Sequence, residues 1–599
     1  MFIIDAAPIT KIPLPDSQIF SYFFREKIAP GSIISVPLFK RKSFAVVLAY
    51  VPIAERKINL KSNAFQLKSV IEINSKNALR PHQLVLAQQL SEYYFEPLGL
   101  FLKLMLPNSK YYSKIIVSSK KLIAQTLQIM PSLNQLPNVK GLRESNKITE
   151  ISSRVTPKKF FAAWSEIRNN QAGNIVGTRQ SIFSPITPKA AIIIENEESP
   201  NYKSSEQAPR YNTKRIAQLL KKNSQCNVTL KSSSPSIESA FLSDNNQLNL
   251  EINPKLKLKK NIQIIDNKEE IKNKNYSLLS NTLSNAIIKN HAEKKNTILF
   301  INRRGSGNAI WCQDCANVIK CMNCTTALIL HNDNNNELIC HHCGHRENPP
   351  SICPECQSHK LRIVGGGTQK VKDQLSSLLP ADRILILDSD NAVSATSQRE
   401  IIEKFNSDFG QILVATQMIF NHDINDVNLI GVISADSLLH FPDYKSGEKT
   451  WQIINKLCQM TNKDILIQTN FPEHYLIKAI VNYDFKNFYL AEIATRKLLS
   501  WPPFSQLIKL SYRNSNEKQA HSNADILLKR IIELRDRLLI KESDFILLGP
   551  APAFIAKLKG YYQYNIIIKN KLTDIKVRNN ILSNIPKGWD IDIDPESIL

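Results

Sequence analysis

Residues 312–356 read CQDCANVIKCMNCTTALILHNDNNNELICHHCGHRENPPSICPEC and hold four Cys-x-x-Cys pairs. The pairs are Cys312/Cys315, Cys321/Cys324, Cys340/Cys343 and Cys353/Cys356. Zinc prefers four tetrahedral thiolates, and each Cys-x-x-Cys turn supplies two of them from one short loop. Eight thiolates therefore make two complete structural sites and leave no coordination position open for catalysis. The sequence predicts two zinc ions per chain in this stretch.

The order of the pairs allows two ways to assemble the sites. Fifteen residues separate Cys324 from Cys340, which is the spacing of a zinc ribbon. Joining these inner pairs gives a nested arrangement, with Cys312, Cys315, Cys353 and Cys356 at zinc 1 and Cys321, Cys324, Cys340 and Cys343 at zinc 2. A crossed arrangement, in which the first pair joins the third, is also geometrically possible. In either case about 10–16 kcal/mol of binding per site would dominate the folding of so short a segment.

The overall composition indicates which class of partner the chain binds and in which cellular compartment it acts. The chain has 599 residues and carries 77 Lys and Arg against 53 Asp and Glu, a formal charge of +24. Such a charge favours a polyanion such as nucleic acid, although a compositional bias toward Lys, Asn and Ile would produce it too. The N-terminus shows no secretory signal, and no apolar run approaches the ~18 residues of a membrane span. With the cysteines paired for metal, this predicts a cytoplasmic protein with no membrane partner.

The sequence on either side of the cysteines predicts α/β structure. Strand-like runs at 297–301, 383–387, 411–414 and 428–433 are separated by helix-length segments, as in a parallel sheet that the cysteine module interrupts. Upstream, short strands such as 190–194 alternate with helical stretches.

The two ends of the chain differ from this middle part. The first 112 residues alternate apolar and polar positions and then run into a helical pattern near 81–94, which predicts a β-rich domain closed by helices. Residues 246–295 are rich in Lys and Asn and predict a linker with a surface helix. A further α/β unit follows Pro502-Pro503.

Ordered local matches run nearly from end to end of the chain. They include Tyr93-Tyr94-x-x-Pro97-Leu-Gly99, Val176-Gly-Thr-Arg179, Pro209-Arg-Tyr211, Cys340-His-His-Cys-Gly344, Thr416-Gln-Met418, Trp501-Pro-Pro-Phe504, Leu548-Gly-Pro-Ala-Pro552 and Asp592-Ile-Asp-Pro595. In these the chain resembles the bacterial replication restart protein PriA (primosomal protein N′) family.

The resemblance implies an α/β multidomain fold with six segments. These are a 3′-DNA-end-binding-like domain (1–112), a remnant of RecA-like helicase lobe one (113–245), a linker with the start of lobe two (246–310), the two-zinc module (311–357), the rest of lobe two (358–480) and a C-terminal domain (481–599). It also implies candidate DNA contacts at Lys68, Tyr22, Tyr93 and Tyr94, although helix packing is the alternative for Tyr93 and Tyr94.

The nucleotide motifs depart from the family. A P-loop needs Gly-x-x-x-x-Gly-Lys-Ser/Thr, and none of the 17 glycines precedes a Lys. The family's P-loop and winged helix would fall between residues 112 and 126, which leaves no room for them. Its Asp-Glu-x-His motif reads Glu195-Asn196-Glu197-Glu198, and its arginine-finger motif is replaced by Cys458–Lys463. These losses predict a chain with no catalytic residues that does not use ATP and Mg²⁺.

Three hypotheses follow. The first is a non-catalytic restart factor that binds single-stranded or forked DNA and works with primosome proteins and the loader of the replicative helicase at the nucleoid. Single-stranded DNA-binding protein would be a further partner, but Tyr561-Tyr-Gln-Tyr564 stands where the family has Arg-x-Arg, which weakens that case. The second is an active ATP-dependent 3′-to-5′ helicase, and the third is a decaying, non-functional homologue.

Overall fold

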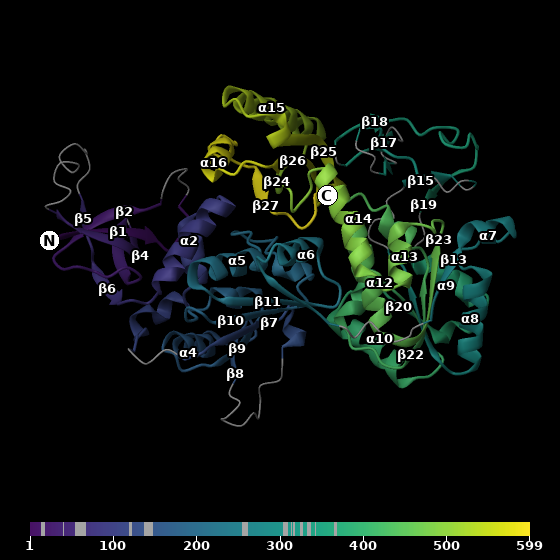
Figure 1. Cartoon of the computed structure of the whole chain (residues 1–599), viewed down its shortest axis with the longest axis horizontal. Coiled ribbons are helices and arrows are strands. Elements are labelled where there is room, and N and C mark those ends of the chain that lie inside the picture. The colour runs from purple at the N-terminus through teal and green to yellow at the C-terminus, as the bar shows by residue number, and fades with distance from the viewer. Residues whose placement is uncertain are drawn as a thin grey trace.

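The computed structural model describes residues 1–12, 18–39, 41–53, 67–118, 123–136, 148–253, 261–302, 309–312, 314, 318–323, 327–331, 337–341, 343–364 and 368–599. The chain is mixed α/β and its described residues build five sheets, one of which (β15–β19, residues 309–364) is inserted between strands of another. In Figure 1 the N-terminal unit and two α/β lobes lie in a row, with the C-terminal unit and the cysteine module above them. Among the helices of the described segments, none is both long and apolar enough to cross a bilayer.

The N-terminal sheet has the order β5-β2-β1-β4-β3-β6. Its strands are β1 (Phe2–Pro8), β2 (Phe20–Phe24), β3 (Ile33–Leu38), β4 (Arg41–Pro52), β5 (Lys68–Ser69) and β6 (Glu72–Ser75). Neighbouring residues of a strand face opposite sides of a sheet. Ile34 accordingly joins a small core on one face, and Ile33 joins a larger core with α2 (Pro81–Tyr94) and α3 (Leu98–Leu104) on the other. The predicted β-rich domain closed by helices is present.

The first lobe is a parallel sheet with the order β12-β11-β10-β7-β9-β8. Its strands are β7 (Thr126–Ile129), β8 (Ile148–Ile151), β9 (Asn174–Gly177), β10 (Ala191–Glu195), β11 (Asn227–Ser232) and β12 (Asn249–Ile252). The helical elements are η2 (Leu133–Gln135), α4 (Pro157–Arg168), η4 (Arg179–Phe183), η5 (Pro200–Tyr202), α5 (Thr213–Ser224) and α6 (Ile237–Asp244). A short helix, η1 (Ser109–Lys114), packs against β6 of the N-terminal unit and leads into this lobe.

The second lobe is also parallel, with the order β13-β23-β22-β14-β21-β20. Its strands are β13 (Asn261–Asp266), β14 (Asn296–Phe300), β20 (Ile384–Leu387), β21 (Ile412–Ala415), β22 (Val427–Val432) and β23 (Thr461–Thr469). The helical elements are α7 (Asn267–Lys272), α8 (Asn281–Ala292), α9 (Thr368–Ser376), η7 (Ala381–Arg383), α10 (Ala395–Ser407), η8 (Gln417–Asn421), α11 (Asp436–Leu439), α12 (Ser446–Gln459), α13 (Tyr475–Val481) and α14 (Phe485–Leu498).

Two boundaries differ from those expected. Residues 246–295 are more than a linker, because β12 completes the first sheet and β13 the edge of the second. Both edge strands are rich in polar side chains, which hid them from a search for apolar runs. Helix α14 lies past residue 480 but packs Phe488 into the second-lobe core. The first lobe thus extends beyond 245 and the second beyond 480.

The two remaining sheets are antiparallel. The cysteine module has the order β18-β17-β16-β15-β19, with β15 (Ala309–Cys312), β16 (Ile329–His331), β17 (Glu337–Ile339), β18 (Arg346–Glu347) and β19 (Leu361–Val364). The C-terminal unit has the order β25-β26-β24-β27, with β24 (Gln506–Asn514), β25 (Phe545–Leu558), β26 (Tyr561–Asn570), β27 (Asp590–Ile593), α15 (Glu517–Arg537), η9 (Glu542–Asp544) and α16 (Ile575–Ser583).

Candidate functional site

The described thiols of the cysteine module form two groups. One contains Cys312, Cys353 and Cys356, the other Cys321, Cys340 and Cys343, and within each group all sulfur atoms lie within 4.8 Å of one another. The sulfurs of Cys312 and Cys356 are 3.5 Å apart, and those of Cys321 and Cys343 are 3.6 Å apart. Four thiolates at about 2.3 Å from a tetrahedral zinc would stand about 3.8 Å apart. The donor type and spacing therefore fit zinc.

These groups have the composition of the nested arrangement, and neither contains the combination that a crossed arrangement would need. Cys315 and Cys324, the fourth ligand predicted for each site, lie outside the described residues. The full ligand set and the metal itself remain predictions.

Each group receives two of its thiols from a short turn of the same type. The amide of Gly344 donates to the carbonyl of Cys340, and that of Gln357 to the carbonyl of Cys353, each at 2.9 Å. Gly344 and Gln357 both adopt a left-handed conformation, with φ of 78° and 61°. Each turn brings its two cysteines to one side, which is how a Cys-x-x-Cys loop offers two ligands to one ion.

The cysteine module is fixed to the C-terminal unit. The buried ring of His341 contacts the carbonyl of Pro552 through Nδ1 at 2.9 Å and packs against Phe554 at 5.4 Å. Arg346 donates to the hydroxyl of Tyr564 at 3.3 Å. A Cβ on Gly344 would lie 2.3 Å from the carbonyl oxygen of Pro550, so only glycine permits this approach.

We expect Gly344→Ala to loosen this junction, because it adds a backbone clash to an unfavourable φ. Gly560→Ala is the matched control, since Gly560 has φ of 84° with nothing within 4 Å of a Cβ. A left-handed conformation costs a non-glycine residue about 1–3 kcal/mol. The control should therefore lower the free energy of unfolding by no more than that, and Gly344→Ala should lower it by clearly more. Hydrogen exchange of β25 and β26 measures the difference. Equal protection in the two variants would contradict the close contact.

The loops at the carboxyl ends of the first-lobe strands are where an α/β lobe binds its ligand. Among the described residues there, Gly177 is the only glycine, and it precedes Thr178 rather than Lys. The cluster at 365–367 lies outside the described residues. The acidic stretch 195–198 follows β10 at the same edge, where Asn196 turns the chain with φ of 48°.

Glu197 points into the protein, and both of its carboxylate oxygens already have donors. Oε1 accepts the amide of Ser236 at 2.6 Å. Oε2 accepts Lys214 Nζ at 2.7 Å and the hydroxyls of Ser236 and Ser239 at 2.9 and 2.6 Å. Burial raises the pKa of Glu197, but Lys214 and these hydrogen bonds outweigh it and hold the pKa below its usual value. The carboxylate is therefore charged and committed to a lysine.

The neighbouring carboxylates are also engaged by lysines. Glu195 accepts Gln128 Nε2 at 2.9 Å and lies 3.8 Å from Lys231 Nζ. Buried Glu198 accepts the Ser232 hydroxyl at 2.7 Å and lies 3.5 Å from Lys456 Nζ. Lys456 belongs to α12 of the second lobe, so this last ion pair joins the two lobes.

A buried ionic cluster strengthens the same junction. Its centre is Arg496 of α14, which is 1% exposed in its side chain and lies 2.8 Å from Glu448, 3.3 Å from Glu238 and 3.3 Å from Glu492. Glu238 belongs to α6 of the first lobe, whereas the other members come from α12 and α14. Burial lowers the pKa of Arg496, but the three carboxylates outweigh it and keep the guanidinium charged.

Apolar contacts follow the same path. Ile237 and Ala240 of α6 lie in one core with Trp451 and Phe488 of the second lobe. The two lobes are thus joined by a shared core and by buried charges.

The predicted DNA contacts lie in different environments. Tyr22 and Tyr94 are each 3% exposed, and the Tyr94 hydroxyl accepts the amide of Asn212 at 2.9 Å. Tyr93 donates to Asp594 at 2.7 Å, and Arg215 covers its ring at 4.4 Å. For Tyr93 and Tyr94, these partners favour the helix-packing alternative over base stacking. The contact at Tyr22 stays a prediction. Lys68 is exposed, beside Tyr22 in the register of β5 and β2.

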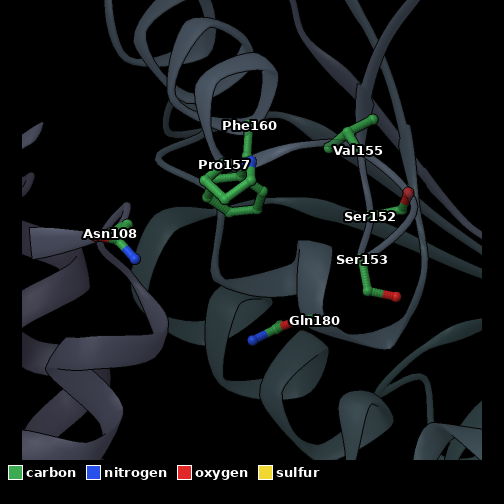
Figure 2. Close-up of a pocket in the computed structure, with 7 residues that line it drawn as sticks. All are labelled: Asn108, Ser152, Ser153, Val155, Pro157, Phe160 and Gln180. Carbon is green, nitrogen blue, oxygen red and sulfur yellow. The ribbon is translucent and has the colours of Figure 1, made fainter. Parts of the chain in front are cut away.

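A surface pocket that the sequence did not indicate opens where the N-terminal unit meets the first lobe. It has a volume of about 210 Å³ and is lined by Asn108, Ser152, Ser153, Val155, Pro157, Phe160 and Gln180. Figure 2 shows Asn108 entering from one side while the other residues come from the loop after β8, from α4 and from η4. Its lining is uncharged and offers hydroxyl and amide groups.

Comparison with known proteins identifies both ends of the chain. A family model described as 3′DNA-binding domain (3′BD) matches residues 11–107, and one described as Primosomal protein N C-terminal domain matches residues 497–596. Among solved structures, RecG bound to a three-way DNA junction aligns at 12% identity and a TM-score of 0.29 over 75% of this chain and 52% of that one, too weakly to carry an argument.

Curated relatives also match the sequence between these two ends. Replication restart protein PriA of Synechocystis sp. is 30% identical over 79% of this chain, and that of Bacillus subtilis is 30% identical over 76%. The chain spans only 59% and 57% of the lengths of these two relatives. PriA of Rickettsia felis is 25% identical over 98% of this chain and 99% of its own length. With PriA-specific models at both ends and PriA proteins matching most of the sequence between them, the chain belongs to the PriA family.

Proposed function

We propose that this protein binds single-stranded or forked DNA and supports replication restart without hydrolysing ATP. The PriA relatives carry the name replication restart protein, and the chain retains a region that matches a 3′DNA-binding domain. Its charge of +24 suits a polyanion. Its contribution would be to hold the fork and help to reload the replicative helicase.

The observation that carries the non-catalytic part is Asn196, which stands where the family motif has its glutamate and whose amide cannot act as a general base, in an acidic stretch whose other carboxylates are engaged by lysines. Mg²⁺ in a nucleotide site is held through carboxylate oxygens, phosphates and waters in near-octahedral geometry. Here the oxygens of Glu197 accept four short hydrogen bonds, one of them from an ammonium group. Glu198 is paired with Lys456 from the other lobe. No glycine of the sequence precedes a lysine, so a phosphate-binding P-loop is missing as well.

The cysteine module would hold two structural zinc ions. Cys312, Cys315, Cys353 and Cys356 would bind one, and Cys321, Cys324, Cys340 and Cys343 the other. Zinc would supply folding energy and no chemistry, since four thiolates fill each site. We propose that the module and the C-terminal unit, held together through Gly344 and His341, present one surface to primosome proteins and the helicase loader. Single-stranded DNA-binding protein is a further candidate partner.

We expect a labelled fork to bind equally well with and without ATP. Because lysines and arginines release counterions from DNA, affinity should fall steeply as salt rises, with a slope of about −0.7 to −0.9 per phosphate contact. Fluorescence anisotropy over a salt series measures this. Binding that requires ATP, or no binding at low salt, would contradict the proposal. Loss of the protein should also impair recovery from stalled replication, and unimpaired recovery would favour a decaying homologue.

A further inference from the structure

The contact between the N-terminal unit and the first lobe carries an aromatic and basic surface that none of the predicted contacts includes. Tyr111 of η1 stacks on Phe161 of α4, with ring centroids 4.6 Å apart and planes 3° from parallel. The ammonium groups of Lys110 and Lys114 lie 5.1 and 5.9 Å from the centre of the same tyrosine ring. Tyr111 is half-buried, and both lysines are exposed.

This surface adjoins the pocket of Figure 2. Asn108 lines the pocket and also caps η1, where its side chain accepts the amide of Lys110 at 3.2 Å. Phe160 lines the pocket, and the next residue, Phe161, supports Tyr111. The ring and its two ammonium groups thus lie next to the pocket through the cap of η1 and neighbouring residues of α4, and we call this set the Tyr111 platform (Asn108, Lys110, Tyr111, Lys114, Phe160 and Phe161).

The platform is held in place by hydrogen bonds between α4 and the chain on both sides of η1. Trp164 of α4 donates to the carbonyl of Met105 at 2.9 Å. Asn169 at the end of α4 accepts the amide of Ser118 at 2.8 Å and donates to the carbonyl of Ile116 at 3.0 Å. Hydrogen bonds on both sides of η1 thus fix Tyr111 relative to α4, which gives a ligand a preformed surface.

The charge near the platform favours an anion. Lys158 and Lys159, on the first turn of α4, are exposed in addition to Lys110 and Lys114. The carboxylate of Glu150 is occupied, since Arg154 donates to it at 2.8 and 3.1 Å and Ser152 also donates to it. The described residues that line the pocket include no acid.

We propose that the Tyr111 platform binds single-stranded DNA, with one base stacked on Tyr111 and the adjoining phosphates on Lys110 and Lys114. Proteins that bind unpaired strands use aromatic rings flanked by cations. Every base can stack on such a ring, and every phosphate carries a negative charge that the cations attract. The hydroxyl and amide groups of the pocket would contact the sugar and phosphate of the next nucleotide. The platform begins at residue 108, directly after the region matched by the 3′DNA-binding domain model, which places it at the junction of that domain and the first lobe.

This inference rests on the proposed DNA-binding function and is tested on the full-length, zinc-loaded protein with a fluorescein-labelled oligothymidylate. Stacking on one ring corresponds to a change in Kd of about 5- to 100-fold, so Tyr111→Ala should weaken binding by that factor. Tyr111→Trp should retain it. The control is Tyr276→Ala, which removes an exposed tyrosine elsewhere and should leave Kd unchanged.

The contribution of the two lysines is tested by the salt dependence of DNA binding. The double variant Lys110→Ala/Lys114→Ala should reduce the slope of log K against log salt by about 1.4, since each contact with a single strand contributes about 0.7. Photo-crosslinking to bromouridine-substituted DNA should label a peptide that contains Tyr111, which covers the case of a poorly folded alanine variant.

The outcomes separate the inference from the function on which it rests. If the unmodified protein binds but both sets of variants bind equally well and no crosslink falls in 108–118, the platform is refuted and the proposed function stands. If the unmodified protein binds neither oligothymidylate nor forks at low salt, the proposed function is refuted together with the platform.

Discussion

Replacing one zinc ligand should remove one metal ion and unfold the cysteine module. We expect two zinc ions per chain in the purified protein, one in Cys340→Ser and one in Cys353→Ser. Binding of about 10–16 kcal/mol per structural site is far more than a module with so small a core can replace. Elemental analysis gives the zinc content, and hydrogen exchange over 309–364 gives the loss of structure. Cys226→Ala, which removes a buried thiol of the first lobe, is the control and should retain both ions.

Double variants distinguish the two arrangements of the sites. In the nested arrangement Cys312 and Cys353 share an ion, so Cys312→Ser/Cys353→Ser should retain one zinc, whereas Cys312→Ser/Cys340→Ser should retain none. A crossed arrangement predicts the reverse. The proximity of Cys312 to Cys353 and Cys356 leads us to expect the first result. A protein with one zinc or none before any substitution would contradict the two-site account.

Removing Arg496 should release the two lobes from each other. Arg496→Ala leaves Glu238, Glu448 and Glu492 without their shared guanidinium, and breaking a buried ion pair from one side costs about 3–5 kcal/mol. Exchange of protected amides in α6, α12 and α14 should then accelerate on the order of 10²- to 10³-fold. Native-state hydrogen exchange at pH 7.5 measures this acceleration.

A surface pair of the second lobe provides the control. Lys478 lies 2.6 Å from Glu473, but both side chains are largely exposed, and such pairs contribute about 0–1 kcal/mol. Lys478→Ala should therefore leave exchange in these three helices nearly unchanged. If Arg496→Ala behaves like Lys478→Ala, the ionic cluster does not hold the lobes together.

The apolar strands of the two lobes could be predicted because buried parallel strands are nearly continuous in hydrophobic residues. The runs at 297–301 and 428–433 correspond to β14 and β22, and the helical pattern at 81–94 corresponds to α2. The polar edge strand β13 was missed because its polar residues Asn261 and Gln263 face solvent and interrupt the apolar run, and it is defined only by pairing with β23.

The candidate sites show the same limit. The spacing of the cysteines is a local property and predicted the two thiol groups. Tyr93, by contrast, meets Asp594, and Glu198 meets Lys456, each across hundreds of residues. Local sequence contains no signal for such partners. The matching stretches around Tyr93 and Asp592–Pro595 could therefore be read as DNA contacts or family signatures, whereas in the fold they join the N-terminal and C-terminal units.

The lysine partners of the acidic stretch explain how its buried carboxylates are accommodated in the fold. A buried carboxylate needs a positive partner within the protein, and Lys214 supplies it for Glu197. Lys456 does the same for Glu198 and adds a bond between the lobes. We infer that the lobes of this chain act as a fixed scaffold.

The most direct test of this account is ATP hydrolysis by the zinc-loaded protein in the presence of saturating forked DNA and Mg²⁺. We predict a turnover rate at the background of the assay and no stimulation by the fork, while anisotropy in the same buffer shows that the DNA is bound. Turnover well above background that the fork stimulates would contradict the account.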